Sequence, residues 1–504
     1  MCIKLSPLAI SIGLALLASQ TVSAAESETD SAELESITVT ASADASAEGL
    51  SPAHSGGQVA VGGRAGILGT LDHLDSPFSI TAYTNEFIQD RQARSVGDVL
   101  LNDPSVRVAR GFGNFQESYF IRGFVLSSDD IAYNGLYSLL PRQYIATELF
   151  ERVELLRGAS SFLTGASPSG GGIGGNVNLL PKRAPNEPLN RITVGTEHGQ
   201  QGLVSADIAR RFGEEKQFGV RVNTAYRDGG TAIDDEETQL GLFSVGLDWR
   251  GDRARLSADV GYQDNQLDET RTNVTLQGVD RIPSAPDSDS NWAQPWSYSD
   301  EQDWFGTMRG EYDLTETTTA WAAYGLRRTD EENSLGNIRV SDANTGQGSA
   351  FRFDNVRKDE VDTGELGLQG LFNTGNVGHE WVISASFFEL DSKNAYGTGA
   401  TFDTNLYNPF NVEQPPIGFE SNAGLEPRLT NSVQLQSYAI GDTLSFYDEK
   451  LLLTLGIRRQ TIEVKNYDFI TGSKTTDYKE TKNTPVVGVV YKLTPQLTLY
   501  GNYI

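Results

Sequence analysis

Segments in which apolar and polar residues alternate follow one another from about residue 189 to the end of the chain. In residues 254–263, apolar side chains occupy the even positions, and polar side chains or glycine occupy the odd positions. Similar alternation occurs in residues 218–227, 243–249 and 451–457. A period of two is typical of a β-strand with two different faces. The pattern predicts about 13 strands in this part of the chain.

These strands suit a membrane better than a soluble β-sandwich. The face opposite the apolar one carries charges such as Arg221, Asp248 and Asp259, and aromatic residues gather near strand ends. A polar lumen, a lipid-facing apolar band and aromatic girdles are typical of a transmembrane barrel. A sandwich would bury the apolar face and seldom needs strands longer than about ten residues. We therefore predict a transmembrane antiparallel β-barrel over residues 186–504.

Short and long connections alternate between the predicted strands. The short turns are residues 251–253, 315–317 and 448–449, and the long polar stretches are residues 265–301, 331–358 and 393–431. Short turns at one rim and long loops at the other are typical of outer-membrane barrels. The strand pattern is unfinished at Ile504, and an odd strand number does not close a bacterial barrel. We therefore expect the natural protein to continue beyond Ile504.

The N-terminus is predicted to be an export signal followed by a flexible tail. Residues 5–17 are mostly apolar, and small residues at Val22–Ala24 precede a cleavage site, as in a signal peptide of residues 1–24. Residues 25–68 are rich in Ser, Ala, Gly and acidic side chains, which predicts a flexible tail. One β-prone island, Glu35–Ala41, interrupts the tail and has the character of a strand that adds to the sheet edge of a partner.

Residues 69–185 have the pattern of a mixed α/β domain. Helical spacing runs from Thr84 to Leu101 and stops at Asn102–Pro104. Short strands ending in glycine are predicted at residues 118–124 and 152–158. This compact segment lies between the tail and the predicted barrel.

Composition and charge exclude several classes of function. The 504 residues carry a formal charge of −27, which argues against nucleic-acid binding because no excess of Lys and Arg faces phosphates. The single cysteine, Cys2, lies in the predicted signal peptide, and the four histidines are scattered. We therefore expect no metal site built by the protein, no catalytic residues and no cofactor.

The order of these segments, together with several motifs, resembles the TonB-dependent outer-membrane siderophore receptor family, in particular its ferrichrome-type branch, whose ligands are hydroxamates. The motifs are Ser76–Ile80, Asp98–Leu100 with Asp103–Val106, Phe120–Phe124, Arg152–Gly158 and Gly175–Asn178. The resemblance implies a plug domain, residues 69–185, inside a barrel of about 22 strands, of which about 13 are present here. The chain is then C-terminally truncated, and it belongs in the outer membrane of a Gram-negative bacterium, surrounded by outer-membrane lipid.

The same resemblance implies a partner for the tail and a mechanism. The tail would be periplasmic, and its island would be the TonB box, formed by Glu35, Ser36, Ile37, Thr38, Val39, Thr40 and Ala41. TonB, energised by ExbB and ExbD, would pair with this strand and pull on the plug. A ferric siderophore bound outside would then be released inward, with its iron held by the siderophore.

Candidate ligand residues follow from the two outward plug loops. They are Arg107, Arg110, Phe112, Phe115 and Gln116 in the first loop and Tyr133, Tyr137, Arg142, Gln143 and Tyr144 in the second. Arginine and aromatic side chains suit a bulky, partly anionic, oxygen-rich chelate, although each residue could instead contact the barrel wall. Arg122 and Arg157 resemble the plug arginines of the family that pair with barrel carboxylates; simple solvation at strand ends is the alternative.

Other functions remain open from the sequence. Another scarce ligand, such as cobalamin, haem or a glycan, could use the same TonB-dependent route, although a haem receptor should offer paired loop histidines. A passive porin or adhesin is a further alternative, against which the box and plug argue. The sequence names neither the siderophore nor the barrel residues that contact it.

Overall fold

The computed structural model describes residues 49–110, 116–197, 200–418 and 426–504, all of which lie in one compact unit, Ala41–Ile504. The predicted signal peptide and the predicted TonB box, residues 35–41, lie outside the described residues. Within the described part of the chain, no helix is long and apolar enough to cross a membrane.

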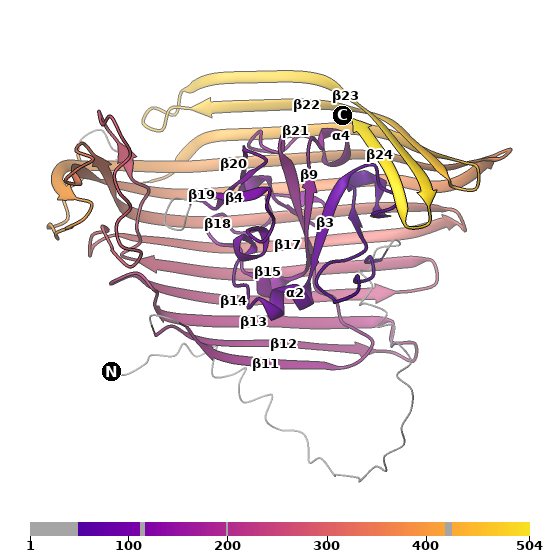
Figure 1. The fold of residues 1–504 in the computed structure, drawn as a ribbon, viewed down its shortest axis with the longest axis horizontal. Helices are drawn as coiled ribbons and strands as arrows, with labels where there is room; N and C mark the ends of the chain where they lie inside the picture. Colours follow the sequence, from indigo (N-terminus) through magenta and orange to yellow (C-terminus); the bar gives the residue numbers. More distant parts are fainter. Residues whose placement is uncertain (1–48, 111–115, 198–199, 419–425) are drawn as a thin grey trace, which may run out of the picture. The chain divides into compact units, whose positions relative to one another are not determined.

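A large sheet of 14 strands forms most of the structure (Figure 1). Its strands are β11 (Leu189–Thr196), β12 (Gly202–Phe212), β13 (Phe218–Gly230), β14 (Glu237–Arg250), β15 (Ala254–Asp268), β17 (Tyr298–Thr315), β18 (Thr318–Val340), β19 (Gln347–Thr374), β20 (Val377–Asn405), β21 (Arg428–Phe446), β22 (Leu451–Tyr467), β23 (Lys474–Thr494) and β24 (Leu497–Tyr503). These 13 strands pair in chain order, each antiparallel to the next, and the short β16 (Thr275–Leu276) pairs with β18. The strand number predicted from alternation agrees with this path.

The two faces of the sheet differ as the alternation predicts. In β15, Val260 is 54% exposed on the outward face, whereas its neighbour Asp259 is 5% exposed on the inward face. Register keeps outward side chains together, so that Phe243, Tyr262 and Trp304 lie side by side on β14, β15 and β17. Such a row of apolar side chains suits lipid, and the inward carboxylates need polar partners inside.

All three predicted long loops are wrong in part, since residues 265–268 and 298–301 also belong to β15 and β17. Residues 331–340 and 347–358 continue β18 and β19, and residues 393–405 continue β20. Ladder pairs such as Ser334 with Asp354 extend these strands. The regular alternation is lost there because polar side chains stand on both faces among a few buried apolar ones such as Ile338 and Val340, while the backbone still forms the ladder.

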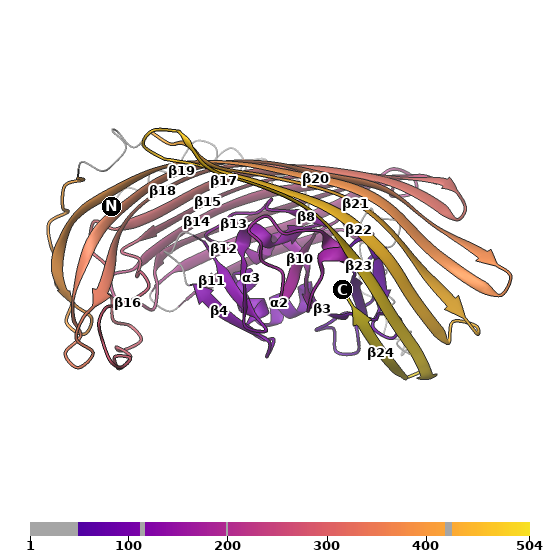
Figure 2. The same ribbon diagram turned by 90° about the horizontal axis from the view of Figure 1, so that it is seen from above.

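A smaller α/β unit, the plug, contains a five-stranded sheet in the order β3-β9-β10-β7-β8. Its strands are β3 (Ser79–Thr84), β7 (Ala132–Tyr133), β8 (Leu136–Tyr137), β9 (Phe150–Arg157) and β10 (Gly175–Pro181); a three-stranded sheet consists of β4 (Val106–Arg110), β5 (Ser118–Ile121) and β6 (Phe124–Ser127). The helices are α2 (Asn85–Asp90), α3 (Val96–Leu100) and α4 (Ser161–Thr164), with 3-10 turns η1 (Gly66–Leu68), η2 (Ser128–Asp130) and η3 (Thr147–Leu149). Figure 2 shows the large sheet curving around this unit.

The helical segment predicted from Thr84 to Leu101 is two short helices. The chain leaves helical geometry at Gln92, which has φ 50°, and α3 begins anew after Ser95. Ser95 accepts from the Asp98 backbone N–H while the Asp98 side chain accepts from the Ser95 N–H, a reciprocal capping box. The chain therefore forms a new helix start at Ser95 in place of one continuous helix.

Ordered structure also begins earlier than the tail prediction of residues 25–68 allows. β1 (Gly62–Arg64) pairs with β2 (Thr70–Asp72), and Ala65 between β1 and η1 is fully buried. The small residues of this stretch fit a close approach: a Cβ at Gly66 would lie 2.2 Å from the Leu163 carbonyl oxygen. The small residues of this stretch therefore allow close packing, and do not only make the backbone flexible.

The plug and the large sheet share one hydrophobic core. Tyr133 of β7 packs edge-on against Phe150 of β9, at 6.1 Å, and against Phe305 of β17, at 5.9 Å between ring centroids. The aromatic contacts therefore join the plug to the wall, the inward face of the large sheet, as well as the plug to itself.

Candidate functional site: the outward plug loops and the wall

The second predicted ligand loop is fastened to the wall through Arg142. Arg142 is 3% exposed; its Nε donates to Asp129 Oδ2 at 3.0 Å, and its Nη1 donates to Glu331 Oε1 of β18 at 2.6 Å. Asp129 belongs to the plug and Glu331 to the wall. One side chain therefore bridges the two units of the fold with charge-assisted hydrogen bonds.

Glu301 of β17 holds the backbone of the same loop. Its carboxylate accepts from the N–H of Arg142 at 2.7 Å and from the N–H of Gln143 at 2.9 Å. The Gln143 amide oxygen accepts in turn from the Ser299 hydroxyl at 3.0 Å. The loop is thus held through main chain and side chain together.

Arg142 is part of a buried ion cluster of six side chains, which we call the Arg142 cluster. Its members are Arg142, Arg327, Arg357, Asp129, Glu331 and Asp359. Arg357 donates to Asp359 at 2.8 Å, and Arg327 lies 3.4 Å from both Asp129 and Asp359. Three positive and three negative charges balance, which is the condition under which buried charges are tolerated.

The pKa of the Asp129 carboxyl reflects this balance. Burial alone would raise it, but the charges of Arg142, Arg327 and Arg357 outweigh burial and hold the pKa well below its usual value. The carboxylate therefore stays ionised throughout the physiological range. It also accepts from Gln116 Nε2 at 3.4 Å, so the first and second predicted loops meet at Asp129.

The tyrosines of the second loop lie between plug and wall. Tyr133 and Tyr137 are 2% and 7% exposed, and the Tyr137 hydroxyl accepts from Asn176 Nδ2 at 2.9 Å. The half-buried Tyr144 accepts from Arg227 Nη1 of β13 at 2.6 Å. Contact with the wall and packing account for what these side chains do in this structure, and their contact with ligand stays a prediction.

The first predicted loop is more open. Arg107 is exposed, and its Nη1 donates to the carbonyls of Pro104 and Val106 at 3.2 and 2.6 Å. Arg110 ends β4 opposite Ser118. Phe112 and Phe115 lie outside the described residues. Among the predicted ligand residues whose side chains the structure describes, Arg107 is therefore the one that is exposed to solvent.

One buried carboxyl that was not predicted from the sequence, Glu117, directly follows the first loop and is hydrogen-bonded through its backbone to the second. Glu117 is 5% exposed and accepts from the Tyr119 hydroxyl at 2.9 Å, while its backbone N–H donates to the Arg142 carbonyl at 2.8 Å. Burial raises the pKa of Glu117 to about 8. Its strand neighbours Ser118–Ile121 gave an apolar strand signal, which offered no hint of a buried acid.

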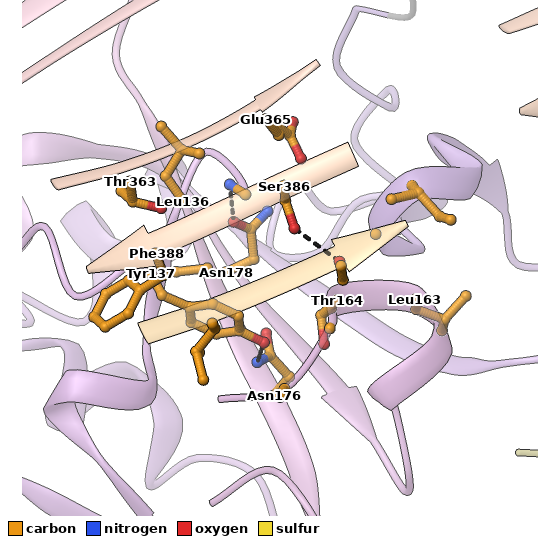
Figure 3. A pocket seen from close by; sticks show the side chains of 18 of the residues that line it. Leu136, Tyr137, Leu163, Thr164, Asn176, Asn178, Thr363, Glu365, Ser386 and Phe388 are labelled. Carbon is orange, nitrogen blue, oxygen red and sulfur yellow. Dashed lines mark hydrogen bonds between the residues drawn. The ribbon is translucent and has the colours of Figure 1, made fainter. Parts of the chain in front are cut away.

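A small cavity lined by both polar and apolar side chains lies deeper, between the plug sheet and strands β19–β22 (Figure 3). Asn176, Asn178 and Tyr137 line it from the plug, and Glu365 and Ser386 line it from the wall. Its volume is about 100 Å³. A space of this size has room for water molecules.

Arg157 and Arg122, predicted to pair with barrel carboxylates, have other surroundings here. Arg157 pairs with Asp103 of the plug and donates to Thr81 Oγ1 at 2.9 Å. Burial opposes ionisation of Asp103, but hydrogen bonds from Arg157 and Ser105 lower its pKa. Arg122 is exposed, with φ 51°, and has no ion-pair partner within the described ranges. A barrel partner for either arginine stays a prediction.

Other residues fasten the plug to the wall without having been predicted. Lys182 lies 3.1 Å from Asp207, and Arg183 reaches both carboxylate oxygens of Asp259 at 2.5 and 2.8 Å. The basic pair directly follows the last plug strand. The inward-facing carboxylates of β12 and β15 were the sequence signal from which these ion pairs could have been predicted.

Wall arginines also donate to plug main-chain carbonyls. Arg327 donates to the Leu140 carbonyl at 2.6 Å. Arg458 of β22 donates to the carbonyls of Phe162 and Leu163, at 2.7 and 3.1 Å, at the end of α4. These contacts depend on the plug backbone and on no particular plug side chain.

No group of three or more His, Cys, Asp or Glu side chains suited to a metal ion occurs among the residues that the structure describes. The site consists instead of an outward loop surface, a charged plug–wall boundary and a cavity between plug and wall.

Comparison with known families agrees with this architecture. Residues 72–172 match the family model described as TonB-dependent Receptor Plug Domain, and residues 225–504, more than half of the chain, match TonB dependent receptor-like, beta-barrel. The chain belongs to the TonB-dependent receptor family. The predicted family, plug-and-barrel fold and outer-membrane location are thereby confirmed, and the family consists of transport receptors rather than enzymes.

Individual relatives are siderophore receptors. The chain is 39% identical over 460 residues to the ferrichrome receptor FcuA of Yersinia enterocolitica, and the match covers 91% of this chain and 60% of FcuA. The crystal structure of BauA, the ferric preacinetobactin receptor of Acinetobacter baumannii, superposes with a TM-score of 0.82 at 32% identity, covering 89% of this chain and 66% of BauA. The ferrichrome outer membrane transporter/phage receptor of Escherichia coli K12 is 24% identical and covers 85% of this chain and 60% of its own length. The chain thus spans about three-fifths of the length of these curated relatives.

Proposed function

We propose that the receptor to which this chain belongs takes up a ferric siderophore across the outer membrane, driven by TonB. The observation that carries the proposal is the 39% identity to a ferrichrome receptor over 91% of the chain. A hydroxamate chelate of the ferrichrome type is the ligand we favour. The protein does not itself have to neutralise the charge of the iron or change its oxidation state, because the siderophore holds the iron.

The proposed ligand surface is the outward end of the plug together with the adjoining wall. Arg107 and Arg110 supply positive charge, Phe112 and Phe115 flat apolar surface, and Gln116 a hydrogen-bonding amide. Gln116 donates to Asp129, the plug carboxylate of the Arg142 cluster. Ligand bound at the first loop can therefore bias the charges that hold the second loop to the wall.

The proposed energy input is mechanical. TonB, with ExbB and ExbD, pairs with residues 35–41 as an added strand and pulls on the plug. The plug boundary is charged and hydrogen-bonded at Arg142, Lys182 and Arg183. Such contacts exchange with water as the plug moves, whereas apolar contacts with the wall, such as that of Tyr133 with Phe305, have to expose their surface.

The test is growth of a siderophore-uptake mutant that carries the full-length gene. Iron-loaded hydroxamate, catecholate and pyoverdine-type chelates are supplied singly, with cobalamin uptake as a separate arm. Growth on a hydroxamate, lost on deletion of residues 35–41 or in a strain lacking TonB, is the expected result. Uptake that survives either loss would instead make the protein a passive pore, and cobalamin-dependent growth alone would overturn the ligand class.

A further inference from the structure

Arg458 of β22 is a buried positive charge beside the cavity between plug and wall. The residue is 2% exposed, and besides the carbonyls of Phe162 and Leu163 its guanidinium reaches the Ser437 hydroxyl, to which Nη1 donates at 2.7 Å. Within the residues that the structure describes, no carboxylate lies at ion-pair distance from this guanidinium. A buried charge without an opposite charge is costly, and neutral oxygen acceptors offset that cost only in part.

The carboxylates that line the cavity have other arginines beside them. The charged lining residues are Arg64, Arg309, Arg458, Glu154 and Glu365. Glu365 accepts from Arg309 Nη1 at 3.2 Å, and Glu154 accepts from the backbone N–H of Arg64 at 3.1 Å. Three cations and two anions therefore face this space, and the charge in excess is that of Arg458.

Trp321 of β18 gives a second and independent sign that the cavity suits an acceptor. The residue lines the same cavity and is 7% exposed, and its indole Nε1 has no hydrogen-bond partner among the residues that the structure describes. An indole N–H can only donate, and a buried one usually finds an acceptor. Both Arg458 and Trp321 thus present donors to this space.

The register of the wall turns these two donors toward each other. Trp321 and Arg458 end one inward-facing row across β18–β22, and the residues between them are the small Gly367, Ser384 and Ala439. The indole leans over Gly367, where a Cβ would lie 2.4 Å from the ring, and Arg458 leans over the neighbouring strand β21. The small residues leave the space between the two donors open.

The plug approaches the same guanidinium with a glycine. Gly165 directly follows α4 and has φ 82°, and a Cβ there would lie 3.3 Å from Arg458 Nη1. The absence of a side chain keeps the guanidinium accessible from the cavity, which Thr164 of the plug and Ser386 of the wall also line (Figure 3).

We propose that this cavity binds a small monovalent inorganic anion such as chloride, with Arg458 as its main donor and Trp321 Nε1 on the opposite side. Each terminal guanidinium nitrogen carries two N–H groups, and Nη1 and Nη2 each use one of them for Ser437 and Leu163, which leaves one N–H on each for the anion. The single excess charge favours a monovalent anion. Because Arg458 also holds the plug carbonyls at α4, the bound anion stabilises the contact between plug and wall, whichever chelate the receptor carries.

The test is hydrogen exchange of the full-length receptor in detergent, in sodium chloride or in sodium gluconate of equal ionic strength. Gluconate is an anion with six carbons, too large for a cavity of about 100 Å³. At a chloride concentration ten times its dissociation constant, the amides of residues 161–166 should exchange about tenfold more slowly, because opening at α4 releases the anion. Equal exchange in the two salts overturns the proposal.

Substitutions at Ser437 separate an effect of the anion from the hydrogen bonds that Arg458 makes itself. Ser437→Asp places a carboxylate beside Arg458 Nη1 and keeps the arginine, so the chloride dependence should disappear. Ser437→Asn has nearly the same size without the charge and should keep the dependence. Arg459→Gln removes the adjacent arginine, which is exposed on the outward face of β22, and should also keep it.

Bromide in place of chloride locates the anion directly. Crystals of the full-length receptor grown with bromide should show an anomalous scattering peak at hydrogen-bond distance from the Arg458 guanidinium, and crystals of Ser437→Asp should lack it. A wild-type map without this peak overturns the proposal. The same holds for chloride dependence that persists in Ser437→Asp, or that is lost in Ser437→Asn or Arg459→Gln.

Discussion

The Arg142 guanidinium lies 2.6 Å from the Glu331 carboxylate, so a loop at the outward end of the plug is joined by a buried ion pair to strand β18 of the wall. Both side chains are at most 4% exposed. A buried charge that loses its partner is costly, and the pair is therefore a point at which plug and wall are coupled.

Removal of one partner should loosen the loop. Glu331→Gln leaves Arg142 with less negative charge around it, and we expect a loss of about 3 kcal/mol in local stability. Hydrogen exchange of the amides of residues 140–145, read by mass spectrometry, measures the loss. Arg142→Gln combined with Glu331→Gln should cost less than the sum of the two single changes. Additive effects, or unchanged exchange in Glu331→Gln, would show that the pair does not hold the loop.

Glu117 should make the stability of the plug fall as pH rises. Its pKa in the fold, about 8, lies above the ordinary value of 4.5, so the folded state binds the proton more tightly. Below pH 4.5 both states are protonated and the effect vanishes; between pH 4.5 and 8, stability falls by up to about 1.4 kcal/mol per pH unit. Glu117→Gln should remove this slope in denaturant unfolding at pH 5 to 8. An equal slope in both proteins would contradict the assignment.

The capping box of α3 should contribute to helix stability on a smaller scale. Ser95→Ala removes the acceptor for the Asp98 N–H and should cost about 1 kcal/mol. Hydrogen exchange at Gly97 and Asp98 reports the change. Ser55→Ala, at an exposed position without a cap, is the control and should leave these amides unaffected.

Ligand binding should depend on the exposed first loop. Arg107→Ala removes a positive charge from the proposed ligand surface and should weaken binding of an iron-loaded hydroxamate about tenfold. Equilibrium binding of radiolabelled ferric chelate to cells lacking TonB isolates this step from transport. Lys358→Ala, on the outward face of β19, is the charge-matched control. Equal losses in both variants would point to a general charge effect instead of a site.

Local sequence patterns predicted much of this fold. The parts that were not predicted are formed by residues that carry no local sequence signal. Alternation placed the strands around Val260 and Ile457 because each spans the boundary between lipid and lumen. The same rule failed at residues 331–358, where polar side chains stand on both faces among a few buried apolar ones such as Ile338 and Val340. Helical spacing likewise merged α2 and α3, because the short-range cap at Ser95 interrupts a pattern that otherwise continues.

The candidate site was less predictable than the fold. Arg142 was singled out for its position in an outward loop, but Asp129, Glu331 and Asp359 are brought to it by folding from three separate elements. The spacing of these residues along the chain does not predict that they form a cluster. Glu117 was invisible for a related reason, since burial of an acid depends on what covers it and leaves no pattern in its neighbours.

The wall arginines that hold plug carbonyls have an evolutionary consequence. Arg327 and Arg458 donate to the main-chain carbonyls of Leu140, Phe162 and Leu163, so these hydrogen bonds involve no plug side-chain atom. A lineage can therefore alter other loop side chains toward a new chelate while these main-chain contacts are retained. Part of the attachment of the plug thus depends on its peptide bonds, and not only on the side chains that change with the ligand.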